Sequence, residues 1–156
     1  MNIEAPIVPG ESAAGIQLGS PIEEILKEQE LHLSPEEVVN PLVPLPIITR
    51  YRSAMVDLWV KEGIVEQIMV YDGYRGKLME TIGLGSTIAD IERQIGAVEE
   101  DEEDNLVIRG FPGLCFEIEG YFPDLKDPAF RHAPIKEICV FSLSLPSSSM
   151  GHPMIA

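Results

Sequence analysis

The sequence has little positive charge. Eleven Lys and Arg residues stand against 26 Asp and Glu residues in 156, which gives a formal net charge of −15 and an isoelectric point near 4.4. Such a charge repels phosphate backbones and anionic membrane surfaces, so neither nucleic acid nor a membrane is expected as a partner. The acidity either only keeps the chain soluble or forms a surface for a basic protein.

Cysteine is scarce, and long apolar runs are missing. Cys115 and Cys139 lie in apolar segments without CxxC spacing, which is typical of reduced thiols in a cytosolic protein. No window approaches the ~18 apolar residues of a membrane span. Residues 1–10 contain neither the basic residues nor the apolar run of a targeting signal, so we expect a cytoplasmic location.

Recognisable catalytic motifs are also missing. His32, His132 and His152 are scattered, and no nucleophile elbow, zinc-binding helix motif, phosphate loop or dinucleotide fingerprint occurs. Carboxylate pairs such as Glu117 and Glu119 could support acid–base chemistry only inside a cleft. We therefore expect no enzyme and no cofactor.

The sequence does contain an internal repeat. Residues 16–25 (IQLGSPIEEI) reappear 66 residues later as residues 82–91 (IGLGSTIADI), with six of ten positions identical. In both copies a Gly-Ser pair precedes apolar residues at helical spacing, and Ser20 and Ser86 are the predicted N-caps. Each copy therefore predicts a short helix, and residues 34–37 look like a further helix start.

Strand patterns follow each predicted helix. They cover residues 54–60 and 65–71 in the first copy and residues 106–108, 114–118 and 135–141 in the second. We predict an α+β fold in which two diverged helix-then-antiparallel-meander repeats form one domain, with the helices on one face of the sheet. The single domain 1–156 comprises repeat one (about 12–77), repeat two (about 78–145) and a flexible tail (146–156).

The repeated pattern resembles two groups of proteins. The Gly-Ser cap, the short helix and a last strand of the form Val/Ile-x-x-Ile-x-Val-aromatic resemble the tandem modules of the β-lactamase-inhibitor-protein fold and related small lipoprotein modules. The stretch 85–120, with its acidic run before GFPGLCFE, is similar to small cytoplasmic bacterial immunity proteins. Both resemblances imply a protein that binds another protein.

Alternation along the strands predicts two different sheet faces. One is aliphatic and suits packing under the helices: Val56, Leu58, Val60, Ile68, Val70, Ile138 and Val140. The other mixes aromatic, sulfur-containing and charged residues: Met55, Asp57, Trp59, Lys61, Gln67, Met69, Tyr71, Glu137, Cys139 and Phe141. Either Trp59 and Tyr71 anchor a partner on this mixed face, or loops cover the face and Trp59 belongs to the core.

Two further segments are candidate contacts. The acidic run comprises six carboxylates, Glu99, Glu100, Asp101, Glu102, Glu103 and Asp104. It is a solvated loop, a docking surface for a basic groove or, least in keeping with its spacing, a divalent metal site. The segment 71–76, with Asp72 and Tyr74, is either a structural turn or a loop that contacts a partner.

The leading hypothesis is a non-enzymatic binding module, most concretely an immunity protein that neutralises a basic toxin or effector domain by direct binding. Acidic residues would speed encounter and buried aromatic rings would slow release. One alternative is a chaperone-like adaptor that accompanies a partner for secretion. Another is a small metal-dependent hydrolase. The sequence does not define the oligomeric state.

Overall fold

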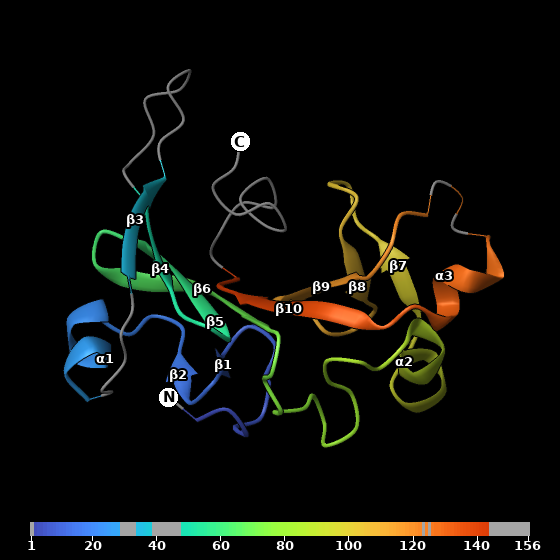
Figure 1. Ribbon diagram of the computed structural model, residues 1–156, viewed down its shortest axis with the longest axis horizontal. Helices are drawn as coiled ribbons and strands as arrows, with labels where there is room; N and C mark the ends of the chain where they lie inside the picture. Colours follow the sequence, from blue (N-terminus) through green and yellow to red (C-terminus); the bar gives the residue numbers. More distant parts are fainter. Residues whose placement is uncertain (1, 29–33, 39–47, 123, 125, 144–156) are drawn as a thin grey trace.

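A single antiparallel sheet of eight strands dominates the computed structural model (Figure 1). The structure describes residues 2–28, 34–38, 48–122, 124 and 126–143. In spatial order the strands are β3 (Ser34–Val38), β4 (Ile48–Arg52), β5 (Val56–Lys61), β6 (Ile64–Tyr71), β10 (Ile135–Phe141), β9 (Leu114–Ile118), β8 (Leu106–Ile108) and β7 (Val98–Glu100). A separate two-stranded pair consists of β1 (Ser12–Ala13) and β2 (Ile16–Gln17).

Helices contribute little to the described part of the chain. They are α1 (Ile22–Glu28), α2 (Ile88–Gln94) and α3 (Pro128–His132), of 7, 7 and 5 residues. The prediction of an α+β domain built from two helix-then-meander repeats is therefore wrong. The chain is mostly β, and the short helices do not form a full layer over the sheet.

Irregular backbone replaces the expected helical layer. The apolar face of the sheet packs against segments that precede β3 and follow β6 in the chain. Their residues include Ile7, Ile16, Tyr74, Leu78 and Ile82, all at most 4% exposed. In Figure 1 these segments lie below the sheet, between α1 and α2. Each helix buries only a short apolar stripe. The repeated helical pattern was therefore correct locally but did not indicate a helical layer over the sheet.

The pairing of β6 with β10 joins the two halves of the sheet. Its register places Ile138 opposite Val70 and Val140 opposite Ile68. These four side chains are at most 2% exposed. They belong to one apolar core, which contains residues from both the N-terminal and the C-terminal half of the chain. The predicted aliphatic face is thus confirmed as core.

A β-bulge lets β6 serve that core along its whole length. The register between β5 and β6 shifts so that Trp59 pairs with Gln67 and Val60 pairs with Val65. The extra residue in β6 turns both Val65 and Ile68 toward the core, although strict alternation would separate them. Both are fully buried.

Local expectations fared differently from one element to the next. The strands predicted at 106–108, 114–118 and 135–141 are confirmed with the same bounds. Residues 34–38 form strand β3, so the helix start predicted there is wrong, because the segment pairs with β4 along its length.

The N-cap of α2 is Thr87 instead of the predicted Ser86. The Thr87 hydroxyl accepts a hydrogen bond from the backbone N–H of Asp90 at 3.2 Å in a capping box. The predicted tail 146–156, His32 and His152 lie outside the described residues.

Tyr74 fastens the N-terminal segment beneath the sheet. Its hydroxyl donates to the carbonyl of Ala5 and accepts from the backbone N–H of Ala14 at 2.9 Å. The ring is 4% exposed, and burial raises the pKa of its hydroxyl. One side chain thus satisfies two backbone groups that the core would otherwise leave unpaired.

We expect Tyr74→Phe to lower the free energy of unfolding by about 2 kcal/mol, because it leaves a buried carbonyl and a buried N–H without their partner. Urea denaturation of the two chains measures the difference. Tyr121→Phe is the matched control, since Tyr121 is 87% exposed, and it should unfold like the wild type. Equal stability of the Tyr74 variant and its control would contradict this role.

Candidate functional site

The candidate site is the sheet face opposite the core, which we call the mixed face. Strand register and alternation place on it the following side chains: Arg50, Arg52, Asp57, Trp59, Gln67, Met69, Tyr71, Cys115, Glu117, Glu137, Cys139 and Phe141. Most of the predicted mixed set is therefore found together. Strand β4, which sequence analysis missed, adds two arginines.

Several side chains of this face are buried, among them that of the predicted contact residue Trp59. Trp59 is 2% exposed and Phe141 is 3% exposed, while Asp57 and Gln67 are fully buried. Tyr71 is partly buried, and its neighbour Asp72 is exposed in the turn that follows β6. Trp59 and Tyr74 therefore present almost no contact area to a partner in this structure.

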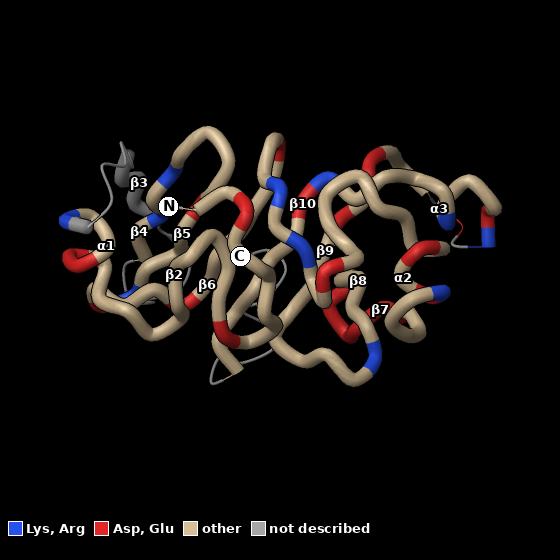
Figure 2. Tube along the Cα trace, turned by 90° about the horizontal axis from the view of Figure 1, so that it is seen from below, with Lys and Arg blue, Asp and Glu red and all other residues tan. Residues whose placement is uncertain are grey.

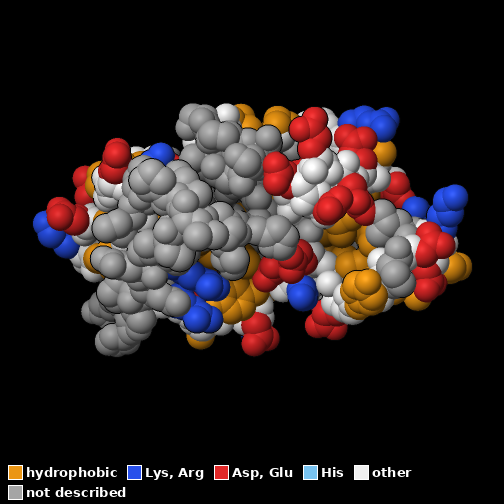
Figure 3. Space-filling model, turned by 90° about the horizontal axis from the view of Figure 1, so that it is seen from above, with side chains coloured by type: hydrophobic (Ala, Val, Ile, Leu, Met, Phe, Trp, Pro, Cys, Tyr) orange, Lys and Arg blue, Asp and Glu red, His pale blue; other side chains and the backbone are white. Residues whose placement is uncertain are grey.

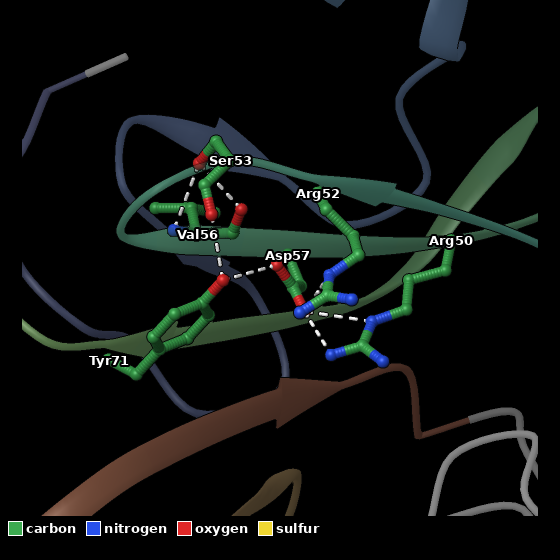
Figure 4. A network of polar contacts seen from close by, with 6 residues as sticks. All are labelled: Arg50, Arg52, Ser53, Val56, Asp57 and Tyr71. Atoms are coloured by element: carbon green, nitrogen blue, oxygen red, sulfur yellow. Dashed lines mark hydrogen bonds and ion pairs between the residues drawn. The ribbon is translucent and has the colours of Figure 1, made fainter. Parts of the chain in front are cut away.

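A polar network centred on Asp57 organises the first half of the mixed face (Figure 4). Arg50 Nε donates to Asp57 Oδ2 at 2.8 Å, and Arg52 Nε lies 4.0 Å from the same oxygen. The Tyr71 hydroxyl lies 2.7 Å from both Asp57 Oδ1 and the Ser53 carbonyl oxygen. It has one proton to donate, and the charged carboxylate is the stronger acceptor.

Burial and this contact explain the state of Tyr71. Loss of solvent, the hydrogen bond to Asp57 and the negative charge of Asp57 together raise the pKa of its hydroxyl to about 12. Tyr71 is thus a neutral donor at physiological pH. Arg50 also stacks on the indole of Trp59, with its Cζ 4.8 Å from the ring centroid. The network is a closed structural unit and has no spare acid or base.

The second half of the mixed face carries two cross-strand pairs. In the β9–β10 register Cys139 lies opposite Cys115, and Glu137 lies opposite Glu117. Gln67 Nε2 donates to Cys139 Sγ at 2.5 Å, whereas its fully buried Oε1 has no hydrogen-bond partner. A cavity of about 20 Å³ borders all five side chains, which is room for about one water molecule.

The two glutamates differ in their surroundings: Glu137 is affected mainly by burial, whereas Glu117 has a lysine beside it. Burial, the hydrogen bond with Glu117 and the negative charge of Glu117 together raise the pKa of Glu137 to about 7. Glu117 in turn lies 3.5 Å from Lys136 Nζ. Two like charges on opposed strands repel, so near neutral pH the pair tends to hold one proton.

The acidic run is part strand and part turn. Glu99 and Glu100 belong to the edge strand β7, which pairs with β8. Asp101 shapes the turn that follows, because its Oδ1 accepts from the backbone N–H groups of Glu103 at 2.8 Å and Asn105 at 2.9 Å. Glu100, Glu102 and Asp104 are exposed, and Figure 2 shows the run beside β7 and β8. The solvated-loop interpretation holds only for its second part.

A groove of about 410 Å³ lies next to this run. Val107, Phe141 and Leu143 provide apolar lining, and Leu143 is 62% exposed. Glu99 and Asp101 provide acidic lining, and Arg109 Nη2 donates to Glu99 Oε2 at 3.1 Å. In Figure 3 acidic side chains surround apolar ones over the half of this face that is not drawn grey. We call the groove lined by these residues the acidic groove.

We also examined the described residues for metal ligands and membrane-spanning helices. Among the residues that the structure describes, no three His, Cys, Asp or Glu side chains gather to hold a metal ion. No helix in that part of the chain is long and apolar enough to cross a membrane. His132 is exposed at the end of α3.

Comparison with known proteins does not assign the chain to a group: no protein family, no curated protein and no solved structure matches it. The resemblances to the β-lactamase-inhibitor-protein fold and to immunity proteins therefore stay predictions. The proposed function therefore rests on the arrangement of the residues described above.

We expect Asp57→Asn to lower the free energy of unfolding by about 3 kcal/mol, because it leaves the largely buried Arg50 guanidinium without its counter-charge. Chemical denaturation followed by tryptophan fluorescence measures the loss at Trp59, the only tryptophan. Asp72→Asn, in the exposed turn, is the control and should change stability little. A loss below about 0.5 kcal/mol for Asp57→Asn would show that the network contributes little.

Glu137 makes stability depend on pH. The unfolded carboxyl loses its proton near pH 4.5 and the folded one near pH 7. Between these values the folded chain binds more protons, so its free energy of unfolding falls as pH rises. We expect Glu137→Gln to remove about 1 kcal/mol of this fall between pH 5 and pH 8, a figure reduced for solvent screening of a partly exposed group.

Denaturation series at several pH values measure that slope. Glu119→Gln, an exposed residue at the end of β9, should leave it unchanged. The same slope in the wild type and in the Glu137 variant would mean that Glu137 titrates as in the unfolded chain.

Proposed function

We propose that this chain is a non-enzymatic protein-binding module that neutralises a basic partner, as an immunity protein neutralises a toxin. The observation that carries the proposal is the acidic groove: an apolar lining, exposed in part at Leu143, beside carboxylates at one end of the sheet. A cationic surface with an apolar side chain at its centre complements such a groove in shape and charge.

The charge distribution supports a basic partner. Residues 98–143 contain eleven acidic residues against four basic ones. Two of the four, Arg109 and Lys136, are already paired with Glu99 and Glu117, and Arg131 is paired with Glu92 of α2. The surface field is therefore negative on this half, which raises the encounter rate with a cation and disfavours nucleic acid.

The same geometry disfavours hydrolysis. The titrating pair Glu117 and Glu137 borders a cavity of about 20 Å³, which is too small for a substrate; of the two, only Glu137 also lines the surface depression of about 500 Å³ beside Tyr71 and Lys136. Inhibition needs only a tight complex, and a reduced cytoplasmic location agrees with two free thiols. The adaptor alternative would use the same groove, and the two differ in what the partner does when this chain is absent.

The test is affinity capture from the organism that makes the chain, with two matched variants. The groove variant is Glu100→Gln/Glu102→Gln/Asp104→Asn, which removes three exposed charges beside the groove. The control variant, Glu23→Gln/Glu24→Gln/Glu62→Gln, removes three exposed charges from α1 and the β5–β6 turn, in the other half of the molecule. We expect one basic, stoichiometric partner for which the groove variant associates about tenfold more slowly at low salt, while the control matches the wild type.

The captured protein is then expressed alone and together with the chain. Growth arrest by the partner alone, relieved by co-expression, supports neutralisation. A harmless partner supports the adaptor alternative. Capture that is unaffected by the groove variant, or a partner that is itself acidic, contradicts the proposed surface.

A further inference from the structure

Two thiols face each other at the middle of the sheet. Cys115 of β9 and Cys139 of β10 are direct register partners, so their side chains project from the same face. Both are free, at 5% and 7% exposure, and they form a small cluster with Phe141 and Val107 that is separate from the main core. Neither takes part in the proposed groove contact.

We propose that Cys115 and Cys139 form a modification site, a dithiol that hydrogen peroxide converts into an intramolecular disulfide. Directly opposed residues of an antiparallel pair have Cα atoms about 4.5–5.5 Å apart. Disulfides span Cα separations of about 4.4–6.8 Å. The two strands can therefore be cross-linked without a change of register.

The surroundings select a small oxidant. Both cysteines line the cavity of about 20 Å³ beside Glu117 and Glu137. A peroxide molecule is little larger than the water for which this cavity has room. Glutathione disulfide is far too large to reach either sulfur, so thiol–disulfide exchange with it requires prior unfolding of the strands.

The proton on Cys139 sets the order of the two steps. Burial raises the pKa of the Cys139 thiol well above its usual value, and the adjacent Cys115 sulfur contributes in the same direction. Cys139 therefore keeps its proton, so the first attack on the peroxide is assigned to Cys115. The Cys115 sulfur forms an S–O bond with one peroxide oxygen while the O–O bond breaks, and the released hydroxide takes up the Cys115 thiol proton to leave as water.

The second step closes the bond. The Cys139 sulfur attacks the sulfenic sulfur of Cys115, the S–O bond breaks, and the hydroxyl leaves as water with the Cys139 proton. Two thiols are oxidised by two electrons in total, and one peroxide is reduced to two waters.

Gln67 makes this disulfide reducible. Its Nε2 donates to Cys139 Sγ in the dithiol form, and its Oε1 has no partner. A disulfide sulfur is a weaker hydrogen-bond acceptor than a thiol sulfur, so the bond leaves this buried amide less well satisfied. The modification should therefore be reversed by a mild dithiol reductant.

The test is treatment of the full folded chain with a small excess of hydrogen peroxide at neutral pH. We expect the intact mass to fall by two hydrogen atoms, non-reducing peptide mapping to join the peptides that contain residues 115 and 139, and dithiothreitol to restore both thiols. Glutathione disulfide under the same conditions should leave the folded chain reduced.

Single variants check the assigned order. Cys139→Ser should stop at a sulfenic acid on Cys115 that dimedone traps, whereas Cys115→Ser should react at least tenfold more slowly. Oxidation of either cysteine to sulfinic acid in the wild type, cross-links only between chains, or no reaction until the chain is denatured would each overturn the proposal. The wild-type mass measurement decides this even if a serine variant does not fold.

Discussion

The antiparallel pairing of β6 with β10 is the constraint on which the rest of the structure depends. It joins two four-stranded meanders into one sheet and buries the edge that each would otherwise expose. Because side chains alternate, one register decides both faces at once. Val70 and Ile138 are paired on the core side of the sheet. The adjacent pair, Met69 and Cys139, lies on the mixed face. The acidic groove, the glutamate pair and the thiol pair all lie where this register places β9 and β10.

Buried polar groups on the mixed face also help to specify the pairing of β5 with its two neighbours. A slip of β5 by one residue would turn the fully buried Asp57 toward the aliphatic core, away from Arg50 of β4 and Tyr71 of β6. A buried ion pair adds little net stability compared with an apolar pair, but it is costly to break. The Asp57 network therefore acts more against wrong pairings than in favour of the right one.

Strands with clear boundaries in the sequence could be predicted from it, but the segments that cover them could not. Residues 106–108, 114–118 and 135–141 were predicted with their observed bounds because apolar runs and turn residues delimit them. Strand β4 was missed although Ile48–Arg52 alternates, because two of its five residues are arginines and the segment forms no apolar run. That omission hid the partner of Asp57. The burial of Trp59 and Tyr74 depends on contacts far away in the chain, which no local pattern reveals.

The acidic run shows how one segment can meet two demands. Edge strands invite pairing with other chains, and charged side chains such as Glu99 and Glu100 in β7 oppose it. Asp101 is committed to the turn, and Glu99 to Arg109. Steering of a partner, however, depends on the summed field and needs no fixed contact. Glu100, Glu102 and Asp104 are exposed, so they can protect the edge of the sheet from self-association and attract a basic protein to the adjacent groove with the same charges.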